Sequence, residues 1–264
     1  MNNQYNSQNH GINSVNSSHF KIKKLKSKEN SKNFIKYTDY EINLLPYELA
    51  LIHDKRTFCV YYISLIKIKH NLIFSFFNPN DYNSQIIKID LFFIGFAIYY
   101  TINALFFDDD TMHKIYENKG KFDIEYQLPK IIYSSLISMV LNILLKLLAL
   151  SNDAIIKFKQ NTKRKAAKKK GKYLKKILKI KFILYFIISS IFLLFFWYYI
   201  STFGAIYKNT QLHLLKDTLM SFALSLIYPF GINLLRGILR IPALSDSKKN
   251  RKLLYNFSKL LQII

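Results

Sequence analysis

Residues 157–181 read KFKQNTKRKAAKKKGKYLKKILKIK and lie between two long apolar runs, 131–150 and 182–203. Between positions 151 and 180 there are twelve lysines and arginines and a single acid. Each apolar run is long enough to cross a bilayer, because a hydrocarbon core of ~30 Å needs about 20 helical residues. Basic connections of this length stay on the cytoplasmic side of a membrane. The basic segment therefore sets the direction of both neighbouring spans.

The composition alone would allow a soluble core, but the distribution of the apolar residues is typical of a membrane protein. Half of the 264 residues are apolar, and they are gathered into long runs instead of being spaced at helical or strand periods. Helices are the expected spanning elements, since each one satisfies its own backbone hydrogen bonds. The formal charge of +23 indicates an anionic partner, and the spans favour a lipid surface over nucleic acid. Cys59 is the only cysteine, which excludes an intrachain disulfide and a multi-cysteine zinc site.

Two further apolar runs, about 87–107 and 218–239, complete a set of four predicted spans. The connection 108–130 carries six acids and four lysines, whereas the segments 1–86, 151–180 and 240–264 are basic. The tendency of basic segments to stay inside then places both termini in the cytoplasm. The predicted organisation is a disordered basic tail (1–36), a cytoplasmic or interfacial segment (37–86), a four-helix transmembrane domain (87–239) with the basic cytoplasmic loop 151–180, and a cytoplasmic tail (240–264).

The stretch Phe58–Phe77 is apolar and twenty residues long, but Lys67, Lys69 and His70 lie near its middle. A lysine at the centre of a span costs about 2.5–3.5 kcal/mol even on a lenient insertion scale. We therefore expect an amphipathic helix lying in the cytoplasmic interface. A fifth span is the alternative, although it would move the basic N-terminus outside. The tail 1–36 is rich in Asn, Ser and Lys and is expected to be disordered.

Apart from Lys88 at the very start of the first span, three charged residues lie inside the predicted spans: Asp90, Lys146 and Arg236. Under the four-span topology all three lie toward the cytoplasmic ends of their helices. The long basic side chains can extend to the headgroups, whereas the shorter aspartate needs a partner. We therefore predict an intramembrane charge cluster made of these three residues. An ion pathway is the alternative, although pathways usually place charge nearer the middle of the bilayer.

Uncharged polar side chains are scattered through the predicted spans. Asn103, Asn142 and Asn233 are expected to hydrogen-bond between helices, each contributing about 0.6 kcal/mol. Beyond isolated asparagines and serines we expect no polar stripe along any one span. The sequence therefore disfavours a transport function.

The densest basic patch lies between positions 163 and 170. It looks like a nucleic-acid or nuclear-import patch, but it lacks interleaved aromatic side chains and lies between two spans. Contact with anionic lipid is expected instead, and no nucleic acid is expected as a partner. The residues assigned to this contact are Lys163, Arg164, Lys165, Lys168, Lys169 and Lys170.

No arrangement of residues points to catalysis. Ser-His-Asp, Cys-His, paired-carboxylate and glycine-rich phosphate patterns are missing from suitable places, so neither an enzyme nor a cofactor is expected. The acids 108–110 resemble the start of a calcium loop, but His113 replaces its glycine and Lys119 its final glutamate. No metal site is assigned there, and weak divalent binding by the same oxygens is the alternative.

Several short strings are similar to segments of one group of proteins. They are Tyr37-Thr38-Asp39-Tyr40-Glu41, Asp54-Lys55-Arg56-Thr57, Thr111-Met112-His113-Lys114-Ile115-Tyr116, Phe195-Phe196-Trp197-Tyr198-Tyr199, Tyr207-Lys208-Asn209-Thr210-Gln211 and Ser258-Lys259-Leu260-Leu261-Gln262-Ile263-Ile264. Together they resemble uncharacterised multi-pass membrane proteins of ciliate-type protists. The resemblance covers about 37–264 and implies the C-terminal module of longer chains. It implies no activity and no functional residues.

The sequence thus predicts an all-α integral membrane protein with four transmembrane helices, one interfacial amphipathic helix and a disordered basic N-terminus. The function it favours is a non-enzymatic membrane module, an anchor or scaffold whose basic cytoplasmic face contacts anionic lipid. A subunit of an oligomeric channel or transporter is the alternative, since one four-helix chain offers little polar lining. A homo-oligomer is compatible with either function.

Overall fold

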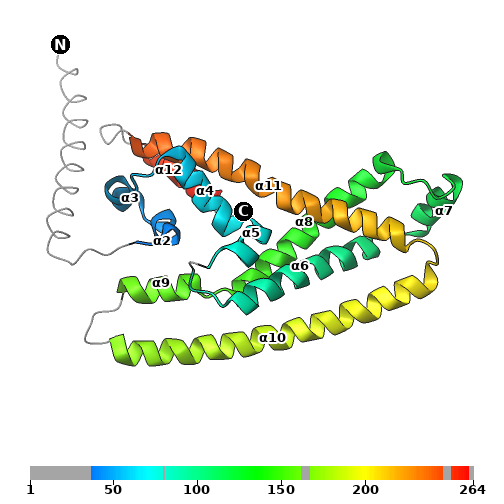
Figure 1. Cartoon of the computed structure of the whole chain (residues 1–264), viewed down its shortest axis with the longest axis horizontal. Helices are drawn as coiled ribbons and strands as arrows, with labels where there is room; N and C mark the ends of the chain where they lie inside the picture. Colours follow the sequence, from blue (N-terminus) through cyan, green and yellow to red (C-terminus); the bar gives the residue numbers. More distant parts are fainter. Residues whose placement is uncertain (1–36, 80, 162–166, 246–250, 262–264) are drawn as a thin grey trace, which may run out of the picture. The chain divides into compact units, whose positions relative to one another are not determined.

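The computed structural model describes residues 37–79, 81–161, 167–245 and 251–261, and every regular element among them is a helix. The predicted disordered tail 1–36 lies outside these residues. In chain order the helices are α2 (Asp39–Leu44), α3 (Tyr47–His53), α4 (Phe58–Lys69), α5 (Asn71–Phe77), α6 (Gln85–Leu105), α7 (Asp109–Glu117), α8 (Ile124–Ala149), α9 (Asn152–Asn161), α10 (Ala167–Ile206), α11 (Gln211–Ser245) and α12 (Lys252–Leu260) (Figure 1).

Four of these helices, α6, α8, α10 and α11, are long and apolar enough to cross a membrane. They coincide with the four predicted spans, so the prediction of an all-α membrane protein is confirmed. The helices extend beyond the apolar runs, because polar residues continue the helical backbone at their ends. With 40 residues, α10 is about 60 Å long, roughly twice the thickness of a hydrocarbon core.

Side-chain caps explain where several helices begin. Thr38 and Glu41 form a reciprocal capping box at the start of α2. The carboxylate of Asp108 accepts the backbone N–H of Thr111 at 2.9 Å and begins α7. Asp123 caps α8 in the same way through the N–H of Tyr126, at 3.2 Å. These caps satisfy backbone N–H groups that the first helical turn leaves without partners.

The segment 58–77 does not form one continuous helix. His70 separates α4 from α5 with an extended backbone, and its ring nitrogen accepts the N–H of Ile73 at 3.4 Å. At 12 and 7 residues these helices are about 18 and 10 Å long, too short to cross a ~30 Å core singly. The prediction of a single helix over 58–77 is therefore wrong, whereas its location in the membrane interface stays a prediction.

The chain divides into two compact units, and the boundaries fall inside α4 and α11. One unit comprises Leu65–Gly231 and is centred on α6, the most buried of the four long helices. Its apolar core joins α6 to α8 and α10 through Ile87, Leu91, Ile94, Ile98, Leu145, Ala149 and Tyr185. Most apolar side chains of α10 face outward, as expected of a helix surrounded by lipid.

The second unit contains residues up to Ser64 together with Ile232–Ile264. Its core consists of Leu45, Tyr47, Ala50, Leu51, Ala243 and Tyr255. The hydroxyl of Tyr255 in α12 donates to the backbone carbonyl of Leu45 at 2.7 Å. This contact and the packing of α12 on α3 hold residues near the two ends of the described chain together.

Candidate functional site

Two of the three predicted intramembrane charges, Asp90 and Arg236, have partners outside the predicted cluster. Asp90 in α6 accepts a hydrogen bond from the Tyr185 hydroxyl of α10 at 2.7 Å. Among the described residues no ion pair joins Asp90 to Lys146. Arg236 is 1% exposed and donates to Asn233 of its own helix at 3.1 Å. The partner of Asp90 is therefore an aromatic hydroxyl. Arg236 belongs to the other unit, so the cluster of Asp90, Lys146 and Arg236 stays a prediction.

Three of the six residues predicted to contact lipid lie at the beginning of α10. Lys168, Lys169 and Lys170 are exposed, whereas Lys163, Arg164 and Lys165 lie outside the described residues. The exposed basic surface continues along the helix through Lys172, Lys175, Lys176 and Lys179. The structure thus presents a lysine-covered helical segment that leads directly into an apolar one.

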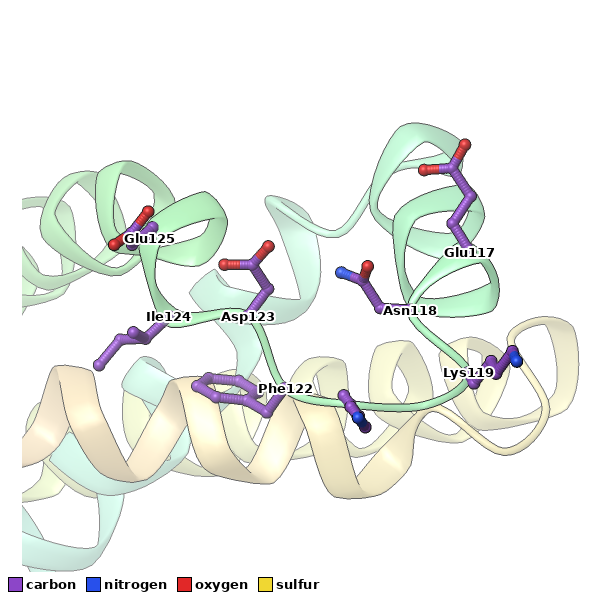
Figure 2. A pocket seen from close by; sticks show the side chains of 8 residues that line it. Glu117, Asn118, Lys119, Phe122, Asp123, Ile124 and Glu125 are labelled. Carbon is purple, nitrogen blue, oxygen red and sulfur yellow. The ribbon is translucent and has the colours of Figure 1, made fainter.

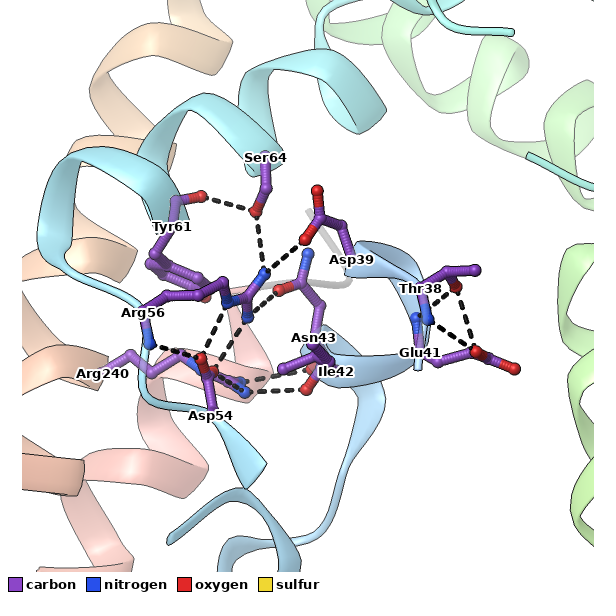
Figure 3. Close-up of polar contacts among 10 residues, drawn as sticks. All are labelled: Thr38, Asp39, Glu41, Ile42, Asn43, Asp54, Arg56, Tyr61, Ser64 and Arg240. Carbon is purple, nitrogen blue, oxygen red and sulfur yellow. Dashed lines mark hydrogen bonds and ion pairs between the residues drawn. The ribbon is translucent and has the colours of Figure 1, made fainter. Parts of the chain in front are cut away.

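A buried charge network occupies the smaller unit (Figure 3). The Asp54 carboxylate accepts hydrogen bonds from Arg240 Nε at 3.1 Å and Nη2 at 2.9 Å, and from Arg56 Nε at 2.8 Å and Nη2 at 2.9 Å. Arg56 also donates to the side chains of Asn43 at 2.7 Å and Ser64 at 3.1 Å. One carboxylate therefore holds two guanidinium groups, each through two nitrogens.

Arg240 is the most enclosed member of this network, with 1% of its surface exposed. It donates to the backbone carbonyls of Ile42 at 3.0 Å and Asn43 at 3.2 Å. Its guanidinium also lies 5.1 Å from the ring centre of Tyr61 and 4.8 Å from that of Tyr255. The sequence assigns Arg240 to the basic tail 240–264, and the structure shows that its side chain is buried rather than part of an exposed basic surface.

The network also determines the protonation of Asp54. Burial alone would raise its pKa, but the hydrogen bonds and charges of Arg56 and Arg240 outweigh burial and hold the pKa below the ordinary value of 3.8. Asp54 therefore stays ionised at neutral pH. The sequence analysis missed this site, although two signals were available: Arg240 follows a long apolar run, and Asp54 and Arg56 are two residues apart.

The larger unit contains a polar junction of three helices. Asn103 Oδ1 of α6 lies 2.7 Å from the Ser134 hydroxyl of α8 and 3.2 Å from the Ser221 hydroxyl of α11. The two hydroxyl oxygens are 3.2 Å apart. The prediction that Asn103 bonds between helices is confirmed. Asn142 donates to the backbone carbonyl of Ser138, and Asn233 accepts from the guanidinium of Arg236, so both of these bonds lie within one helix.

Polar residues recur along α8 at intervals of four: Lys130, Ser134, Ser138, Asn142 and Lys146. Four residues make slightly more than one helical turn, so they form a row that winds slowly around the helix. Ser134 and Ser138 are fully buried. The expectation that no span carries a polar stripe is therefore wrong, because serines that look isolated among leucines in the sequence fall on one side of the helix.

A matching row lies on α11, where Asp217, Ser221 and Ser225 are spaced by four residues and are at least nine-tenths buried. We call Asn103, Ser134, Ser138, Asp217, Ser221 and Ser225 the polar seam. Among the described residues, Ser138 Oγ and Asp217 Oδ1 are buried without a hydrogen-bond partner. The polar seam therefore contains more polar atoms than its own contacts satisfy.

The connection between α7 and α8 forms an open hollow lined by Glu117, Asn118, Lys119, Lys121, Phe122, Asp123, Ile124 and Glu125 (Figure 2). The ring of Phe122 stacks on His213 with centroids 6.0 Å apart, which holds the connection against α11. Asp108 is occupied as the cap of α7 and pairs with Lys130 at 2.7 Å. In the described parts of the chain, no three His, Cys, Asp or Glu side chains are grouped to hold a metal.

Comparison of the chain with protein-family models found no match, and comparisons with curated proteins and with solved structures found none either. The resemblance to multi-pass proteins of protists stays a prediction.

Replacing Asp54 with alanine should destabilise the fold by about 3–5 kcal/mol, since two buried guanidinium groups would lose their anion. Chemical denaturation in mild detergent measures this change. Asp39→Asn is the matched control, because Asp39 lies 3.6 Å from Arg56 but is 60% exposed. Its effect should stay within about 1 kcal/mol. Equal effects of the two substitutions would contradict the assigned role of Asp54.

The free energy of unfolding should also depend on pH through the ionisation of Asp54. Because its folded-state pKa is lowered, the carboxylate contributes stability above pH 3.8 that is lost as the pH falls through the folded-state value. Unfolding measured across this acidic range should show a steeper loss for the unmodified chain than for Asp54→Asn. Parallel curves would show that Asp54 is not ion-paired.

Proposed function

We propose that the protein is a non-enzymatic membrane module, an anchor or scaffold whose basic cytoplasmic face contacts anionic lipid. The observation that carries this proposal is α10, in which exposed lysines occupy the first part and exposed apolar side chains the rest. A helix with this distribution fits a surface where lipid headgroups meet hydrocarbon.

The length of α10 supports the same placement. Residues 182–203 suffice for the hydrocarbon core, so the preceding part from Ala167 to Lys181 extends about 22 Å into and beyond the headgroups. Each lysine near an anionic surface contributes about 1 kcal/mol. The seven exposed lysines of this part (Lys168, Lys169, Lys170, Lys172, Lys175, Lys176 and Lys179) therefore provide a strong attraction for acidic headgroups.

Converting Lys168, Lys169 and Lys170 to glutamine should weaken the association of anionic lipid by up to about 3 kcal/mol, roughly a hundredfold. The measurement reconstitutes the chain in vesicles with and without phosphatidylserine and counts the phosphatidylserine molecules retained after extraction in mild detergent. The control converts Lys119, Lys121 and Lys208, which are also exposed but lie in the connections predicted on the opposite side. Equal retention by the two triple variants would contradict the proposed lipid face.

A second candidate function, a subunit of an oligomeric channel or transporter, is favoured by the polar seam. Buried polar atoms without partners are costly in a membrane protein, and polar residues inside a span often mark a path for ions. The neutral oxygens of Asn103, Ser134 and Ser221 lie where three spanning helices meet. This observation supports transport without bearing on the lipid contact of α10.

Vesicles containing the protein should show sodium or potassium flux above that of empty vesicles if the second function holds. Ser134→Val should reduce the flux at least tenfold, because two added methyl groups replace a hydroxyl within the polar seam. Ser190→Val, on the exposed side of α10, is the matched control and should leave the flux unchanged. Flux no greater than in empty vesicles would refute transport and leave the anchor function standing.

A further inference from the structure

The short helix α12 carries exposed apolar side chains along one side. Leu253, Phe257 and Leu260 are 87%, 52% and 58% exposed. At about 100° of rotation per residue they lie within about 60° of one another, so they form one row. In the described parts of the chain no other large apolar side chain is as exposed as Leu253, including those of α10. We call these three residues the α12 row.

The opposite side of α12 is fixed to the unit that contains it. Tyr255 is fully buried and donates to the carbonyl of Leu45 at 2.7 Å, and Ser258 is 1% exposed. Tyr255 also belongs to the apolar core that includes Ala243, near the end of α11. The fold therefore determines which side of α12 is buried, and the α12 row points out of the unit.

The end of α11 indicates how deep α12 lies relative to a membrane. The predicted span of α11 ends at residue 239, and Ala243 follows about 6 Å further along the helix. The headgroup region on each side of the hydrocarbon core is about 5–8 Å thick. Arg251, just before α12, donates to the carbonyl of Pro242 at 2.9 Å, so α12 begins beside this same part of α11. These contacts place α12 at the depth of the headgroups.

The charges of α12 favour an acidic surface. The helix contains two lysines and no acid, and both lysines lie between the α12 row and the buried side. Lys259 donates to the carbonyl of Leu44 at 3.3 Å, a neutral partner that leaves its charge uncompensated. Lys252 lies 3.1 Å from Glu48, but both side chains are about half exposed, so this pair is weak. Lysines in these positions can reach phosphate groups while the row meets acyl chains.

A protein partner or a second copy is the other occupant that an exposed apolar row could have. Three side chains on a helix about 14 Å long offer far less than the ~800 Å² per partner that a stable protein interface buries. Lipid needs no such area, because α11 already holds α12 beside the membrane. The small size of the row therefore favours lipid.

We propose that α12 lies in the headgroup region of the membrane that α11 crosses, with the α12 row inserted at the boundary between headgroups and acyl chains. Interfacial helices bury their apolar side about 5–10 Å into this boundary. The inference rests on the membrane placement of α11, which is part of the proposed function, but it does not require lipid contact by the lysines of α10.

Spin labelling measures this insertion directly. In a Cys59→Ser background, Leu253→Cys or Phe257→Cys is labelled with a nitroxide, and the full chain is reconstituted in vesicles of phosphatidylcholine and phosphatidylserine. Collisions with oxygen, which partitions into lipid, are compared with collisions with a water-soluble nickel chelate. The references are Leu194→Cys, on the exposed apolar surface of α10, and Lys121→Cys, in an exposed connection.

Nickel collisions at Leu253 and Phe257 should be about fivefold fewer than at Lys121, and oxygen collisions should approach those at Leu194. Nickel collisions equal to those at Lys121 would overturn the proposal. Protection from both probes would also overturn it, because it would show a protein partner or a second copy. A water-accessible label at Leu194 would instead refute the membrane placement and the proposed function together.

A paired substitution tests whether the row itself holds α12 in the membrane. With a label on Leu260→Cys, Leu253→Gln combined with Phe257→Gln should raise nickel collisions to the level of Lys121. Asn256→Gln changes an exposed polar side chain of the same helix and should leave them unaltered. Because the two substituted side chains are exposed, the melting temperature in detergent should not change. An unaltered nickel collision rate in the paired variant would overturn the proposal.

Discussion

The structure depends on how polar groups are satisfied where water is absent. At the junction of α6, α8 and α11, Asn103 accepts from serines of two different helices and donates to the backbone of its own. Such bonds are individually modest, about 0.6 kcal/mol, but they specify which sides of the helices meet. Apolar packing in a lipid environment provides less discrimination, because the lipid is as apolar as leucine. The bonds of Asn103 therefore select which sides of α6, α8 and α11 face one another at this junction.

In the smaller unit, by contrast, the buried polar groups are charged and form ion pairs. There Asp54 neutralises Arg56 and Arg240, and backbone carbonyls and aromatic rings accommodate the rest of the Arg240 guanidinium. The network connects α11 to residues that precede α4, which are distant in sequence. On α10, by contrast, the lysines remain exposed and unneutralised by the fold. The first arrangement stabilises structure, whereas the second leaves charge available for a surface outside the protein.

Much of the fold followed from the sequence, because crossing a membrane imposes a simple rule on length and polarity. Four apolar runs predicted the helices α6, α8, α10 and α11. The hydrogen bond of Asn103 to a neighbouring helix was also predicted. The break at His70 was not foreseen, since a single residue with an extended backbone leaves no mark on an apolar pattern. Pairings between distant segments, such as Asp54 with Arg240, depend on tertiary contacts that one sequence cannot show.

The candidate site was harder to predict than the fold for a related reason. Asp90, Lys146 and Arg236 stood out because they are charged, yet Asp90 found its partner in Tyr185, a residue hidden among many aromatics. The serines of α8 and α11 stood out least, because serine is tolerated almost anywhere in a spanning helix. Their importance arises only when the two rows face each other across Asn103.

The central claim is that these rows meet, and disulfide cross-linking tests it most directly. In a Cys59→Ser background, cysteines replacing Ser134 and Ser221 should cross-link readily in membranes, since the native hydroxyl oxygens are 3.2 Å apart. A cysteine at Ser134 paired with one at Leu224, which is 40% exposed, should not. Efficient cross-linking of the first pair alone is the result the structure predicts. Failure of the first pair, or equal cross-linking of both, would contradict the arrangement of α8 and α11.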